Sequence, residues 1–312
     1  MQSLWMLFAT FMFAAMGVCV KLASDLYSTS EIVMYRGIIG TLLLYFLVRI
    51  NGGTLKTALP WQHAWRGIVG VTALWMWFYS VGVLPLAMSM TLNYTAPIWI
   101  AAFLFILGLR RRQTRFEWRL AAAILASFAG ILLLLRPTIH DGQLAGGIIA
   151  LISGMLSALA YLQVRRLGHM GEPEYRVVFY FSLTGVLGGL LGSLLSSLLQ
   201  PDAQAPLWHA HTAKGIVLLL GIGILAAIAQ MAMTRAYRLG NALLTANLQY
   251  TGIVFSSLWG IAIWGDALNL LGWMGIGMIV FSGVAATFYN VRNTARAQTR
   301  TEAAPDAIAS EV

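Results

Sequence analysis

The stretch Leu92–Phe103, LNYTAPIWIAAF, has a degenerate counterpart at Leu248–Trp259, LQYTGIVFSSLW. In both stretches an amide residue, a tyrosine and a threonine follow one another inside a segment that is otherwise apolar. Polar side chains in such a segment need partners, because hydrocarbon offers them none. The two stretches therefore indicate an internal repeat whose polar residues meet inside the protein.

The composition places this repeat in a membrane. Of the 312 residues, 59% are hydrophobic and 10% are charged, whereas soluble domains carry roughly 25% charged residues. A membrane-spanning helix needs about 20 apolar residues, and a lipid-exposed strand would leave backbone groups unpaired. The sequence predicts an all-α integral membrane protein with ten transmembrane helices, at 4–23, 32–49, 67–84, 87–109, 118–135, 144–164, 176–198, 214–236, 242–264 and 270–290.

The distribution of lysine and arginine predicts how the chain is threaded. If the N-terminus is cytoplasmic, sixteen of the 20 basic residues fall in cytoplasmic loops and the tail, and Arg136 and Lys214 fall on the other side. The remaining two, Lys21 and Arg36, lie inside spans. Such a bias sets orientation in membranes, so we expect both termini in the cytoplasm of a bacterial cell with the chain in its inner membrane. The net charge of +9 is then a topology signal, and we expect the lipid bilayer as a partner and no nucleic acid.

The two quoted stretches lie in the fourth and ninth predicted spans, which are an odd number of spans apart. The second copy therefore enters the membrane from the opposite face. Two five-helix halves of inverted topology are the architecture of many secondary transporters, with the substrate site between the halves near the midplane. We expect residues 1–140 to form the first repeat, 141–292 the second inverted repeat, and 293–312 a disordered cytoplasmic tail.

The candidate binding residues are the cations, amides and aromatic side chains within the spans. A cation inside a span is a functional candidate by default, although Lys21 and Arg36 have the alternatives of snorkelling or of pairing with the nearby Asp25 and Glu31. Aromatic faces together with a cation suggest an organic solute with a ring or amphipathic body and an anionic or zwitterionic end. The candidates for a substrate cavity are Arg36, Lys21, Trp75, Tyr79, Asn93, Tyr94, Trp99, Tyr161, Gln230, Gln249 and Tyr250.

The sequence gives little support for catalysis, metal binding or proton coupling. No Asp or Glu lies in the middle of a predicted span, and all five histidines fall in loops, so no residue is an obvious proton relay. The pair His209 and His211 is too small a ligand set for a metal, and the single Cys19 excludes an intramolecular disulfide. We expect no catalytic residue, no metal site and no cofactor, and facilitated exchange or drive by the membrane potential fits better than proton coupling.

Four longer stretches carry a family resemblance: GVCVKLASDLYSTSEIVMYRGIIGTLLLY (17–45), LPLAMSMTLNYTAPIWIAAF (84–103), GILLLLRP (130–137) and GGIIALISGMLSALAYLQVRRL (146–167). They resemble the EamA-type ten-helix permeases of the drug/metabolite transporter (DMT) superfamily, whose members often carry a lysine at the end of helix one and an arginine early in helix two. Here these would be Lys21 and Arg36. The resemblance covers about residues 4–290.

The resemblance implies a substrate cavity lined by the third, fourth, eighth and ninth spans. We hypothesise a monomeric or homodimeric secondary transporter that exports a small organic metabolite, such as an amino acid or an aromatic or amphipathic zwitterion, by alternating access. The family also handles nucleotide derivatives, vitamins and drugs. An uptake exchanger for a nucleoside-type metabolite, such as S-adenosylmethionine or a riboflavin-like molecule, therefore remains the alternative, followed by a drug efflux carrier.

Overall fold

The computed structural model describes residues 2–84, 86–110, 117–135, 144–199, 208–265 and 267–309, and within these ranges every regular element is an α-helix. The first half of the chain contributes α1 (Gln2–Ala23), α2 (Thr29–Ile50), α3 (Pro60–Val83), α4 (Leu86–Asn93), α5 (Ala96–Arg110) and α6 (Trp118–Leu135). The second half contributes α7 (Leu144–His169), α8 (Glu174–Leu199), α9 (Ala213–Leu239), α10 (Ala242–Gln249), α11 (Thr251–Trp264) and α12 (Leu270–Ala309).

The helices correspond to the predicted spans. Eight helical segments in the described ranges are long and apolar enough to cross a membrane. The two other predicted spans coincide with α3 and with α10 joined to α11, while α4 joined to α5 forms the predicted fourth span. The protein is therefore an all-α, multi-pass membrane protein, and the helices are consistent with ten crossings. We call the face at which α1 begins the N-terminal face.

Local sequence signals set several helix ends. Ser28 and Glu31 form a reciprocal capping box at the start of α2, which satisfies two backbone donors that the helix leaves unpaired. Asn241 caps α10, and Gly265 ends α11 in the left-handed conformation at φ 70°. Pro60 begins α3, a position where its missing N–H costs nothing. Consequently α3 starts earlier than residue 67, where hydropathy alone placed the start of the span.

The two repeated stretches each break a span into two short helices. In the first, α4 ends at Asn93 and α5 begins at Ala96; in the second, α10 ends at Gln249 and α11 begins at Thr251. The threonine of each stretch donates its hydroxyl to the carbonyl three residues earlier, from Thr95 to the Leu92 oxygen at 2.6 Å and from Thr251 to the Leu248 oxygen at 2.7 Å. A backbone carbonyl at membrane depth needs a partner, and the threonine of each stretch provides one.

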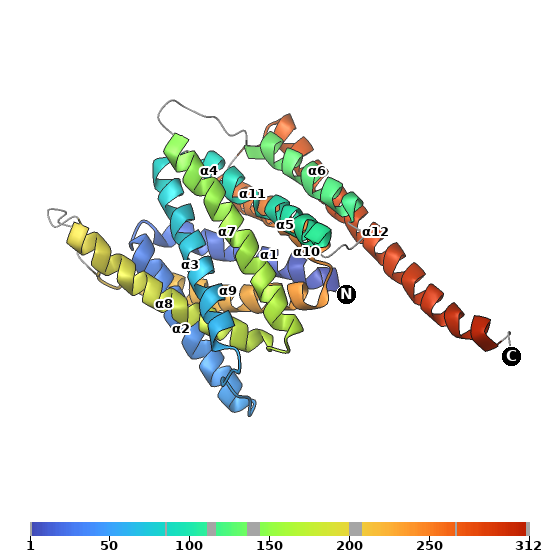
Figure 1. Ribbon diagram of the computed structural model, residues 1–312. Coiled ribbons are helices and arrows are strands. Elements are labelled where there is room, and N and C mark those ends of the chain that lie inside the picture. The colour runs from blue at the N-terminus through green and yellow to red at the C-terminus, as the bar shows by residue number, and fades with distance from the viewer. Residues whose placement is uncertain are drawn as a thin grey trace.

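The two halves interleave in pairs. The most extensive contacts join α1 to α9, α2 to α8, α3 to α7 and α6 to α12, and each pair takes one helix from each half. This set of pairs maps onto itself when the halves are exchanged, as an inverted repeat requires. Glycine permits the close approach: a Cβ on Gly37 of α2 would lie 2.7 Å from the Ser182 carbonyl oxygen on α8. Figure 1 shows α6 lying alongside the first part of α12, at the edge of the bundle.

The last helix extends past the predicted tenth span. α12 continues to Ala309 instead of ending near residue 290, so most of the tail for which the sequence predicted disorder is helical (Figure 1). Extending an existing helix adds one hydrogen bond per residue without a new nucleation cost. The Ala-, Arg-, Gln- and Glu-containing tail also carries residues of good helix propensity.

Candidate functional site

A cavity of about 330 Å³ lies between the two halves, within the range usual for small-molecule sites. The first half contributes side chains from α1 to α5, and the second contributes side chains from α7 to α11. Along α1 the lining runs from Met6 to Val20, about 21 Å at the rise of an α-helix. The polar and aromatic lining residues are Thr10, Phe13, Arg36, Arg66, Trp77, Asn93, Tyr94, Ser157, Tyr161, Phe181, Gln230, Gln249 and Ser256.

Two arginines share one aromatic ring in this cavity. The guanidinium carbon of Arg66, on α3, lies 4.1 Å from the centroid of Phe181, and that of Arg36, on α2, lies 5.7 Å from the same centroid. A cation over an aromatic face is stabilised by the ring quadrupole. A contact with a ring does not use the N–H donors of a guanidinium as a hydrogen bond would, so those donors need other partners.

Three of those donor nitrogens are unpaired within the part of the chain that the structure describes. Arg66 is 3% exposed, and its Nε and Nη1 have no hydrogen-bond partner in the described part of the chain; the same holds for the buried Nε of Arg36. Among the described residues neither arginine takes part in an ion pair. A buried charge without a partner is costly, so an anionic group in the cavity would be a favourable partner for both side chains.

The buried carboxylates lie elsewhere, at the two ends of the bundle. Glu31 accepts hydrogen bonds from the backbone of Ser28 at 2.8 Å and of His209 at 2.7 Å, and therefore does not pair with Arg36 as the sequence allowed. On the N-terminal face, Glu172 accepts from Thr57 at 2.5 Å and from Arg176 at 2.9 Å. Burial alone would raise the pKa of Glu172, but these hydrogen bonds and the charge of Arg176 hold it below its usual value.

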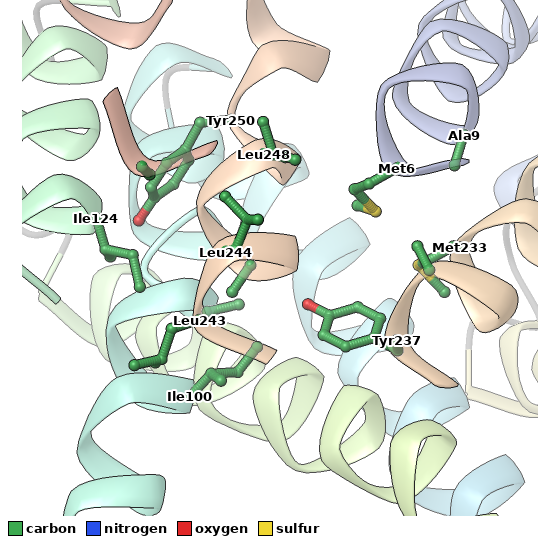
Figure 2. Close-up of a cluster of buried hydrophobic side chains, with 14 of the residues drawn as sticks. Met6, Ala9, Ile100, Ile124, Met233, Tyr237, Leu243, Leu244, Leu248 and Tyr250 are labelled. Carbon is green, nitrogen blue, oxygen red and sulfur yellow. The ribbon is translucent and has the colours of Figure 1, made fainter. Parts of the chain in front are cut away.

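An apolar cluster closes the cavity toward the N-terminal face. Met6 and Met233 line the cavity and also belong to the largest cluster of buried side chains. Figure 2 shows them in that cluster with Tyr237, one helical turn further along α9. Tyr161, from the cavity wall, stacks on Tyr237 with ring centroids 5.7 Å apart and planes 9° apart. A solute in the cavity is therefore separated from this face by packed side chains.

Six of the predicted site residues line the cavity. These are Arg36, Asn93, Tyr94, Tyr161, Gln230 and Gln249. The two helix breaks meet beside it, since the rings of Tyr94 and Tyr250 lie 6.4 Å apart. Asn93 also braces the wall, because its Nδ2 donates to the Ser153 hydroxyl at 2.9 Å.

Five predicted residues lie outside the cavity lining. Lys21 is exposed at the end of α1, with its Nζ 3.9 Å from the ring centroid of Trp264, as expected of a snorkelling lysine. Tyr79 is 56% exposed on the opposite side of α3 from the cavity-lining residues, and Tyr250 is fully buried in the apolar cluster. Trp75 packs against the glycines of α8, where a Cβ on Gly192 would collide with it, and Trp99 stacks on Phe103.

Sequence reasoning missed Arg66 and Phe181. Arg66 was counted as a loop residue because the predicted third span began at residue 67, whereas α3 begins at Pro60 and buries Arg66 in its second turn. Pro60 is a common helix-start signal and would have moved the boundary. Phe181 belongs to an apolar run in α8, and no sequence signal distinguishes it from packing residues.

Comparison with known proteins finds a transporter family and relatives that are named as transporters. Residues 1–136 match the EamA-like transporter family. The chain is 29% identical over 277 residues to the pseudopaline exporter CntI of Pseudomonas aeruginosa, covering 89% of this chain and 92% of that protein. It is 26% identical over 303 residues to a riboflavin transporter of Rhizobium johnstonii, covering 94% and 92%. A protein crystal structure superimposes with a TM-score of 0.76 at 18% identity, covering 92% of this chain and 98% of that one, which shows a shared fold.

Proposed function

Because this chain is an EamA-type member of the drug/metabolite transporter superfamily, we propose that it is a secondary transporter that moves a small organic metabolite by alternating access. Its place is the bacterial inner membrane, with both termini in the cytoplasm, and the direction is export. The arginine and lysine bias of the loops supports this orientation.

One observation carries the proposal: a cavity between the two halves, beside two broken helices, that contains two unpaired cations. Secondary transporters bind their substrates at such a position, where discontinuous helices meet near the midplane. Ionisable groups at this depth are associated with substrate pathways.

The closed N-terminal face supports alternating access. The contacts of Thr57 and His63 with Glu172 join the two halves at that face, while the cavity runs along α1 toward the opposite face. With the N-terminus in the cytoplasm, this arrangement corresponds to a state closed to the cytoplasm. Transport then requires these contacts to separate when the other face closes.

The cavity chemistry narrows the solute. Its apolar and aromatic walls suit a ring or hydrocarbon body, and its arginines suit an anionic end. S-adenosylmethionine carries a net positive charge and would meet two cations, so the cavity disfavours this candidate. A riboflavin-like solute remains a second candidate, because Trp77, Tyr94 and Phe181 line the cavity and offer aromatic faces to a flat ring system.

Counterflow in proteoliposomes tests the function. Purified protein is reconstituted with an unlabelled panel of organic acids, amino acids and riboflavin inside, and uptake of the labelled counterpart is measured. We expect uptake of at least one organic acid above protein-free liposomes. Failure to move any member of a broad panel would refute the proposal.

A further inference from the structure

We propose that the cavity selects solutes that carry two carboxylates on one end of an apolar body, with Arg36 and Arg66 each binding one carboxylate. This inference rests on the proposed transport function and names the substrate class of the same cavity. It adds Arg66 as a residue that determines specificity.

The first observation that supports this proposal is the charge of the cavity. Arg36 and Arg66 line it, and no Asp or Glu is among its described lining residues. The site therefore presents two positive charges without compensation. A monoanion would leave one of them unpaired, and the ammonium group of a zwitterion would face both without a carboxylate partner. Two carboxylates on the solute remove the cost of both buried cations.

The geometry allows each arginine to bind an anionic group of its own. The guanidinium carbons lie 4.1 Å and 5.7 Å from one ring centroid, so they are no further apart than these two distances taken together. The two groups come from different helices, and each has an unpaired in-plane donor. Arginine binds carboxylate through two parallel N–H donors, so each guanidinium can hold its own carboxylate.

The remainder of the cavity defines the body of the solute. Phe13, Leu74, Trp77 and Met90 line it together with other apolar side chains. Such a surface gains from contact with a hydrocarbon or an aromatic ring and does not compensate further charge. A short dicarboxylic acid that bears a phenyl group combines the two parts.

A pair of probes tests the second carboxylate directly. Benzylsuccinate has two carboxylates and a phenyl ring, and 4-phenylbutanoate is the same molecule without one carboxylate. Binding to the purified protein is measured by isothermal titration calorimetry. We expect benzylsuccinate to bind at least about tenfold more tightly, since a charge-assisted hydrogen-bonded pair is worth more than a neutral one. Equal affinities would overturn the proposal without any variant being needed.

Arg66→Gln then tests the assignment of the second cation. It should weaken benzylsuccinate by at least about tenfold and leave 4-phenylbutanoate within about threefold. Arg66→Lys should restore part of the preference, because the charge remains while the bidentate geometry is lost. Arg49→Gln, at an exposed arginine of α2, is the matched control and should change neither affinity. Equal weakening of both probes by Arg66→Gln would mean a structural role and would contradict the assignment.

Two further measurements distinguish this proposal from its alternatives. If 2-phenylethyl phosphate binds more tightly than benzylsuccinate, a single phosphate is the preferred ligand and the dicarboxylate proposal is wrong. Counterflow separates failure of this inference from failure of the function: transport of other organic acids without a benzylsuccinate preference refutes only the substrate class. An absence of transport for the entire panel refutes the function itself.

Discussion

The breaks at Thr95 and Thr251 share a threonine hydrogen bond but have different surroundings. Both threonines donate to a carbonyl three residues earlier, and the interruption covers Tyr94 and Thr95 in the first stretch and Tyr250 alone in the second. Tyr94 beside the first break lines the cavity, whereas Tyr250 beside the second is fully buried in the apolar cluster. A repeated motif therefore specifies a shared hydrogen bond to the backbone, and it does not specify a shared role for its tyrosines.

The two halves also contribute different side chains to the cavity. The first half supplies both cations of the cavity, Arg36 and Arg66, and the second half supplies Phe181, against which both are placed. Tyr161, also from the second half, connects the cavity to its closed end. Neither half could form this site alone, and substitutions should show which half contributes binding and which contributes packing.

The largest effect is expected from Arg36→Ala. Loss of a buried cation that pairs with a substrate anion should reduce transport by about 100-fold or more. The unfolding temperature should not fall, because the change removes an uncompensated charge. Counterflow and thermal unfolding in detergent are the measurements, with Arg49→Ala as the control on the same helix. An unchanged transport rate would show that Arg36 only snorkels.

The next comparison sets Tyr250→Ala against Tyr94→Ala. Truncating the buried Tyr250 should lower the stability by about 3–5 kcal/mol, as for other aromatic residues in a core. Truncating Tyr94 should instead weaken solute binding by about 1–3 kcal/mol while having a smaller effect on unfolding. Denaturant titration and calorimetric binding separate the two quantities. Identical behaviour of the two variants would contradict the asymmetry of the breaks.

A smaller difference is expected between Thr251→Val and Thr95→Val. Each substitution keeps the shape and removes a hydroxyl, at a cost of about 0.5–1 kcal/mol for one hydrogen bond. The Thr251 hydroxyl also lies 2.9 Å from that of Thr10, so Thr251→Val should be the more damaging. Thermal unfolding of both variants in one detergent ranks them, and the reverse order would show that the contact with Thr10 contributes nothing.

The smallest effect belongs to Tyr79→Ala. The side chain is 56% exposed and does not line the cavity, so solute affinity should stay within about 0.5 kcal/mol of the unsubstituted protein. Binding of benzylsuccinate to this variant is the measurement. A loss comparable to that of Tyr94→Ala would place Tyr79 in the transport path after all.

Hydropathy predicted the helices, because the length of an apolar run is a local property of the sequence, whereas the interruptions within the fourth and ninth spans were not predicted. Which individual side chains point into the cavity could not be predicted in the same way. Tyr79 and Tyr250 satisfy the same aromatic criterion as Tyr94, and only packing decides which ring meets the cavity. Arg66 was missed for a local reason, since a difference of a few residues in the start of α3 separates a loop arginine from a buried one.

The broken spans have a mechanical consequence. A continuous helix bends only when some of its ladder bonds lengthen or part. At each interruption fewer ladder bonds must change for the helix to bend, because the carbonyl three residues before the threonine accepts its hydroxyl. Each half thus has one position beside the cavity where bending the helix would disturb little of its hydrogen bonding.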